Sequence, residues 1–129
     1  MWTGHASTEI VPFVVIVNDA NPVKSLTQAE LRRIFTKESR MWPHGEAMVP
    51  VDWESTHYLR AVFCRDVLNR SVREMAEYWV QKSMTQGLTP PSTQRSARAI
   101  TRFVASVPGA ISYVPPSDVG EGVRVVPIK

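Results

Sequence analysis

The chain has 129 residues, which is the size of one domain, and its 43% apolar and 21% charged residues are typical of a soluble globular protein. Fifteen basic and twelve acidic residues give a formal charge of +3, which mildly favours anionic ligands but is too small to indicate nucleic-acid binding. The single cysteine, Cys64, excludes an intramolecular disulfide, and no apolar run approaches the roughly 20 residues of a membrane-spanning helix.

The first nine residues lack the charged start and apolar centre of a signal peptide. We expect residues 1–9 to be a tail or an artificial extension, which leaves any native export signal undetermined. No linker and no internal repeat divides residues 10–129, so the sequence predicts one domain over this range.

The first predicted elements are a strand and a helix. Residues 10–17 are a continuous apolar run rich in β-branched side chains, which predicts a strand buried on both faces. Thr27 and Glu30 have the spacing of a capping box, and Leu26 and Leu31 occupy the positions of a hydrophobic staple. The helix that follows has one apolar face, made of Leu31, Ile34 and Phe35.

The middle of the chain predicts a turn over residues 42–45, a short strand over 47–51 and a second helix capped by Ser55 or Thr56. One side of that helix is apolar, through Leu59, Val62, Phe63 and Val67. Ser71 and Glu74 predict a capping box for a third helix. Its expected buried face is Val72, Met75, Ala76 and Trp79.

The last third of the chain begins with a predicted loop over residues 85–94. Ser96 is expected to cap a fourth helix that ends at Pro108–Gly109. Its inward residues are expected to be Ile100, Phe103, Val104 and Val107. Strands over 110–114 and 123–128 complete an order β-α-β-α-α-α-β-β, which predicts an α/β fold: a small mixed sheet flanked by about four helices.

Several kinds of chemistry have no counterpart in the sequence. The histidines His5, His44 and His57 lack the spacing of a metal site, and no glycine-rich loop predicts a phosphate or dinucleotide cofactor. Cys64 is expected to be a core residue, and no set of nucleophile, base and metal predicts an enzyme. Trp42 and Trp79 are expected in the core, whereas the sequence does not decide whether Trp53 lies in the core or on a stacking surface. Seven arginines are expected on solvated helix faces, namely Arg60, Arg65, Arg70, Arg73, Arg95, Arg98 and Arg102.

Three stretches in order resemble the periplasmic phosphate-binding proteins of ABC transporters. They are residues 14–35 leading into Trp42, residues 49–63, and residues 103–114, where that family usually has glycine in place of Ser112. The resemblance covers roughly residues 11–115 and only one of the family's two lobes. It implies the fold of one lobe of a type II periplasmic binding protein, and export to the periplasm or outside the cell.

In the two-lobe proteins this lobe holds an anion at a helix start, with an arginine followed closely by Ser-Gly-Thr. Hydroxyls, backbone N–H groups and the helix dipole favour an anion there. The matching passage here keeps Ser55 and Thr56 but has no glycine between them, and it places Trp53 and His57 at the arginine and serine positions. Ser55, Thr56, His57 and, one turn on, Arg60 are therefore the predicted anion ligands, with helix capping as the alternative role of Ser55 and Thr56.

Two functions remain open from the sequence. The first is a non-catalytic, exported binding module that binds a small anion such as phosphate weakly, alone or through a homodimer that rebuilds a cleft. The second is a protein-interaction module that keeps the lobe and has lost the ligand. Neither needs a cofactor, a metal, nucleic acid or a membrane span.

Overall fold

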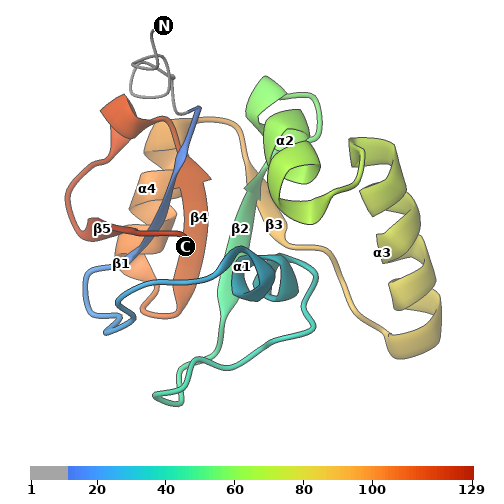
Figure 1. The fold of residues 1–129 in the computed structure, drawn as a ribbon, viewed down its shortest axis with the longest axis horizontal. Coiled ribbons are helices and arrows are strands. Elements are labelled where there is room, and N and C mark those ends of the chain that lie inside the picture. Colours follow the sequence, from blue (N-terminus) through green and yellow to red (C-terminus); the bar gives the residue numbers. More distant parts are fainter. Residues whose placement is uncertain (1–11) are drawn as a thin grey trace, which may run out of the picture.

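The computed structural model describes residues 12–129, so the predicted tail and the first two residues of the predicted first strand lie outside it. The described chain is one five-stranded sheet with helices on both faces (Figure 1). In chain order the elements are β1 (Val14–Asn18), α1 (Gln28–Phe35), β2 (Val49–Trp53), α2 (Tyr58–Phe63), a π-helical turn (Cys64–Leu68), α3 (Val72–Gln86), β3 (Ser92–Gln94), α4 (Ala97–Ser106), β4 (Ala110–Val114), a short 3-10 helix (Pro116–Asp118) and β5 (Val123–Val126). The α/β class predicted from the sequence is confirmed.

The strands lie in the order β3-β2-β4-β1-β5. β2 pairs in parallel with both β3 and β4, whereas β1 runs antiparallel to β4 and β5. The register places Val15 between Tyr113 of β4 and Val126 of β5. The sheet is therefore mixed, and its three parallel strands β2, β3 and β4 end at the same edge.

Local capping signals place three of the helices as predicted. The Thr27 and Ser71 side chains accept from the backbone N–H groups of Glu30 and Glu74, and both capping boxes are complete. Ser96 accepts from the Ala99 N–H at the start of α4. Each cap satisfies backbone donors that have no partner inside the helix, so these starts are fixed by short-range chemistry.

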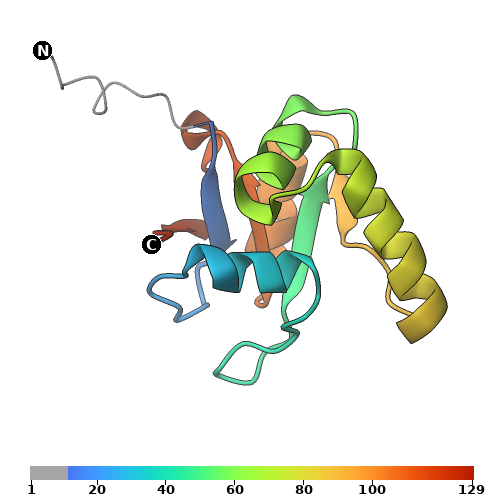
Figure 2. The same cartoon turned by 45° about the vertical axis from the view of Figure 1, so that its right-hand side comes forward.

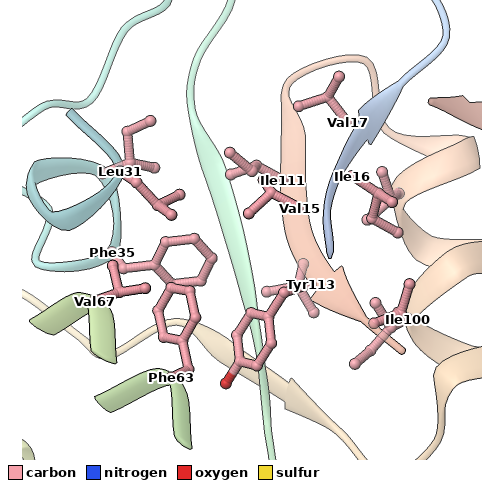
Figure 3. Packing of buried hydrophobic residues seen from close by; sticks show 14 of the residues in the cluster. Val15, Ile16, Val17, Leu31, Phe35, Phe63, Val67, Ile100, Ile111 and Tyr113 are labelled. Carbon is pink, nitrogen blue, oxygen red and sulfur yellow. The ribbon is translucent and has the colours of Figure 1, made fainter. Parts of the chain in front are cut away.

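The core lies on both faces of the sheet (Figure 3). The predicted apolar face of α1 is buried, and the ring of Phe35 packs against that of Phe63 with a centroid distance of 4.7 Å. Phe63 in turn stacks on Tyr113 of β4 at 4.0 Å, and Ile100 of α4 packs on the opposite face. Cys64 is buried in this core, as expected.

The structure corrects several element boundaries. β2 covers Val49–Trp53, two residues later than predicted, so Trp53 is a buried strand residue. The predicted loop over residues 85–94 contains the end of α3 and all of β3, a strand of three polar residues that carries no apolar signal. Strand β5 ends at Val126 instead of 128.

Helix α3 lies beside the sheet, beyond β3, and is the least enclosed helix in both views (Figure 2). Of its fifteen residues only Met75 and Trp79 are buried. Ala76, which was expected on the buried face, is exposed, and so are the next residues on its side of the helix. Besides the face that buries Met75 and Trp79, α3 therefore has a face with apolar side chains that is exposed to solvent.

Candidate functional site

The predicted site residues lie at the edge of the sheet where β2, β3 and β4 end. In open α/β sheets ligands bind outside the carboxyl ends of the strands, because loops and helix starts converge there. Ser55, Thr56 and His57 form the connection from β2 to α2. Ser55 and Thr56 are exposed and His57 is half-buried. The structure thus brings three of the four predicted ligands to one solvent-facing edge.

Helix α2 is capped by His57, not by Ser55 or Thr56 as expected. The His57 Nδ1 accepts a hydrogen bond from the Leu59 N–H at 3.1 Å. The imidazole also stacks on the Trp53 ring, with centroids 4.1 Å apart. An imidazole held this way satisfies the helix start in the way a serine would, so the hydroxyls of Ser55 and Thr56 are not needed as caps.

Arg60 is directed inward, to the end of β2, and not to solvent. Its Nη1 donates to the Trp53 carbonyl at 2.5 Å, and its Nε lies 3.4 Å from Oδ2 of Asp52. The side chain is only 12% exposed, so the expectation of a solvated arginine is wrong at this position. An anion at the edge could use only those guanidinium N–H groups that these partners leave over.

Asp52 is the acceptor at the centre of a buried polar network. Its Oδ1 accepts from the Trp53 N–H at 2.8 Å and from the Tyr113 hydroxyl at 2.5 Å. Burial raises the pKa of Asp52 above its usual range, and the Arg60 guanidinium opposes this rise without cancelling it. Burial, followed by the nearby Asp52 carboxylate, also raises the pKa of the Tyr113 phenol far above its ordinary value.

This network closes a gap between β2 and β4. The two strands are in register only at Val49–Ala110 and Pro50–Ile111. Beyond that point side chains bridge them: the Ser112 hydroxyl donates to the Val51 carbonyl at 2.7 Å, and the Trp53 Nε1 donates to the Tyr113 carbonyl at 2.8 Å. The space where two parallel strands separate is thus filled by Trp53, Tyr113 and the ion pair.

The exposed part of the edge is close to electrically balanced. The Thr56 hydroxyl donates to Glu54 Oε1 at 3.0 Å, and the other carboxylate oxygen of Glu54 lies 3.3 Å from Nε of Arg95, at the end of β3. The Glu54 carboxylate therefore engages the hydroxyl of Thr56, one of the predicted ligands, and lies on the surface where an anion would bind. A negative charge next to a bound anion lowers the affinity of the site for that anion, and the positive charge of Arg95 offsets this effect.

Sequence reasoning missed the inward role of Arg60, although a signal was available. Cys64 and Val67, which the sequence predicts to be core residues, follow Arg60 by four and seven positions, and a helix brings such positions to the same side. The sequence places Glu54 beside the expected anion and Arg95 on the surface, but it does not predict their pairing, because β3 carries no apolar signal and its residues are predicted to be a loop.

Within residues 12–129 no group of three or more histidine, cysteine, aspartate or glutamate side chains could hold a metal ion. In the same range no helix has the length and apolar character needed to cross a membrane.

Comparison with known proteins identifies the fold. No protein-family model matches the sequence, and a search of curated proteins finds no match. Among solved structures the chain is similar to an ABC-type phosphate transport receptor of Vibrio cholerae, with a TM-score of 0.68 and 17% identity over 91% of this chain and 46% of the receptor. It is also similar to a protein assigned to the phosphate ABC transporter substrate-binding proteins of Clostridium perfringens, solved with bound phosphate (TM-score 0.71, 24% identity, 91% of this chain and 44% of the other). PstS of Borrelia burgdorferi gives a TM-score of 0.71 at 11% identity, covering 92% of this chain and 47% of that one.

The chain spans slightly less than half the length of each of these proteins. Its fold is that of one lobe of the phosphate-binding proteins, as the resemblance in the sequence implied. At these identities the likeness concerns the fold, and the site residues have to be argued from their own geometry.

Proposed function

We propose that this chain is a non-catalytic, exported binding module that holds a small anion weakly at the carboxyl edge of β2, β3 and β4. The observation that carries the proposal is the position of Ser55, Thr56 and His57. Two exposed hydroxyls and a half-buried imidazole lie at the edge of the sheet where the parallel strands end. The solved relatives of this fold include one with phosphate bound, which makes phosphate the first anion to test.

The same geometry makes the binding weak. Arg60, the only cationic side chain among the four predicted ligands, is paired with Asp52, and Thr56 is bonded to Glu54. A ligand held at the edge of one lobe also stays partly in water, which screens its contacts. We expect a dissociation constant on the order of 1 mM, equivalent to about −4 kcal/mol.

Glu54 provides the sharpest test. Glu54→Gln removes the negative charge next to the bound anion and weakens the hydrogen bond from the Thr56 hydroxyl, so phosphate should bind several-fold more tightly, by about 0.5–1 kcal/mol. Titration calorimetry with phosphate, sulfate and small carboxylates measures both proteins. The matched control is Glu121→Gln, because Glu121 is exposed near the start of β5, at the opposite end of the sheet. It should leave the affinity unchanged.

If neither the original chain nor the Glu54→Gln variant releases heat or gains thermal stability at millimolar phosphate, sulfate or carboxylate, the anion proposal is wrong. An equal gain in Glu54→Gln and Glu121→Gln would also contradict it, because the effect would then come from net charge and not from a site.

The second candidate is a protein-interaction module that keeps the lobe and has lost the ligand. The balanced charges of Glu54 and Arg95 and the inward Arg60 favour it, because a protein surface needs no net positive charge at this edge. A double Ser55→Ala, Thr56→Ala variant separates the candidates. It should abolish anion binding under the first function and leave the capture of a protein partner intact under the second.

A further inference from the structure

A hollow lies between α4 and the segment that joins β4 to β5, residues 115–122. This segment runs back beside α4 from the end of β4 to the start of β5 (Figure 1). The hollow has a volume of about 460 Å³. Arg98 and Arg102 of α4 line one side of it, and Asp118 and Glu121 of the joining segment line the other. No residue of the proposed anion site borders this hollow.

Close contacts between small residues fix the distance between the two sides. A Cβ on Gly120 would lie 2.9 Å from Cγ2 of Thr101, and a Cβ on Gly122 would lie 2.8 Å from Cβ of Ala105. The backbone of the joining segment therefore lies directly against α4. The Asp19 N–H donates to the Gly122 carbonyl at 3.0 Å, which ties the segment to the end of β1. The shape of the hollow thus depends on this packing and not on contacts between its charged side chains.

The charged groups on the two sides of the hollow have opposite signs and do not pair with each other. Arg98 and Arg102 are one turn apart, so both guanidinium groups extend from the same side of α4. Among residues 12–129 there are four ion pairs, and none of them includes Arg98, Arg102, Asp118 or Glu121. All four side chains belong to exposed residues. The hollow therefore has two positive charges on one side and two negative charges on the other, and no ion pair uses them.

We propose that this hollow binds a small zwitterion of the amino-acid type, with its carboxylate at the two arginines and its ammonium group at Asp118 and Glu121. A guanidinium group donates two parallel hydrogen bonds to a carboxylate, and an ammonium group donates to carboxylate oxygens. The volume falls within the range of about 300–1,000 Å³ that small-molecule sites have. Thr101 and Ala105 also line the hollow and offer methyl groups to the carbon atoms of the ligand.

The arrangement of charge favours a zwitterion over either of its halves. A simple anion at the two arginines would lie near the carboxylates of Asp118 and Glu121, and a simple cation at these carboxylates would lie near the arginines. Each would be attracted by one side of the hollow and repelled by the other, whereas a zwitterion is attracted by both. Because the four groups are exposed, water screens these contacts, and we expect a dissociation constant in the millimolar range.

An NMR titration of the ¹⁵N-labelled chain tests the proposal, because it locates binding by residue through the backbone amide signals. The probes are glycine and γ-aminobutyrate, which hold the two charged groups at different separations, and the corresponding halves are acetate and methylammonium. The amide signals of residues 98–105 and 118–122 should shift, and the better zwitterion should bind at least about fivefold more tightly than either half at equal ionic strength. A smaller preference, or no shift of these signals at about 50 mM of either zwitterion, overturns the proposal.

Substitutions on the two sides test which group of the ligand each side holds. Arg102→Gln and Glu121→Gln should each weaken the binding of the zwitterion about threefold or more. Arg102→Gln should at the same time strengthen the binding of methylammonium, and Glu121→Gln that of acetate, because each variant removes the repulsion of one half. The matched controls are Arg73→Gln and Glu77→Gln, which make the same charge changes at exposed positions of α3, and they should leave binding unchanged.

All four altered positions are exposed, so circular dichroism should show an unchanged fold in every variant. Equal losses in the α3 controls and in the variants of the hollow would overturn the proposal, because the effect would then come from net charge. The phosphate titrations concern the carboxyl edge of β2, β3 and β4, which the hollow does not include, so either proposal can fail alone.

Discussion

Replacing Arg60 with alanine is expected to destabilise the protein by about 3–5 kcal/mol, the usual cost of breaking a buried ion pair by removing one partner. The variant leaves the Asp52 carboxylate buried without its cation and removes a donor from the Trp53 carbonyl. Urea denaturation followed by circular dichroism measures the change. If Arg60 served only as an exposed ligand, its removal would cost little stability.

Arg65→Ala is the matched control, because Arg65 lies in the same helical segment, is 72% exposed and pairs only with its neighbour Asp66. It should cost less than about 1 kcal/mol. Equal losses in the two variants would contradict the role assigned to Arg60. A double variant, Arg60→Met with Asp52→Asn, should recover part of the loss, because it removes both buried charges together.

The pH dependence of the Arg60→Ala variant follows from Asp52. Burial raises the folded-state pKa of this carboxyl above its unfolded value, so the folded protein binds a proton more readily than the unfolded chain does. The stability linked to Asp52 is therefore greatest at low pH and is lost as the pH rises through the folded pKa. Removing Arg60 raises that pKa further, so stability should go on falling to a higher pH in the variant than in the original chain, as urea denaturation at a series of pH values would show.

Replacing Gly109 with alanine is expected to cost about 2–3 kcal/mol, through steric overlap with the backbone. A Cβ at this position would lie 1.8 Å from the Ala47 carbonyl oxygen and 3.0 Å from its carbon. Gly109 cannot move away freely, since its carbonyl accepts from the Val49 N–H and from the Trp42 Nε1, both at 2.9 Å. Thermal and urea denaturation would show the loss.

Gly120→Ala is the control for this substitution. Its Cβ would approach a side-chain methyl of Thr101 at 2.9 Å, with no backbone atom among the contacts, so the neighbour can adjust. We expect a change within about 1 kcal/mol. A Gly109→Ala variant as stable as Gly120→Ala would mean that the β2 and β4 regions can separate without loss, which would contradict the packing described here.

Short-range signals in the sequence were sufficient for much of the fold. The caps at Thr27, Ser71 and Ser96 are contacts between residues three apart, so the sequence contains the whole interaction. Strand β3 could not be predicted in this way, because its three polar residues become a strand only by pairing with β2. The resemblance to phosphate-binding proteins supplied the lobe fold, and the solved structures bear it out.

The candidate site was predicted in its position but not in its pairings. The chain order alone places Ser55–His57 between β2 and α2. The partners of the charged groups come from distant segments: Tyr113 of β4 donates to Asp52, and Arg95 reaches Glu54 from the end of β3. Contacts across about 40–60 residues depend on the tertiary fold, so a helical wheel or a spacing rule does not reveal them.

Strand β1 is synthesised first, yet its pairing partners β4 and β5 are synthesised last, about 100 residues later. Contacts so distant along the chain form slowly, since a long loop has to close before any of them stabilises the structure. The valine-rich β1 segment therefore has no strand partner in the sheet until β4 or β5 has left the ribosome. We expect the sheet to form only after β4 and β5 have emerged, which leaves the β1 segment as a defined apolar stretch for chaperones to protect until then.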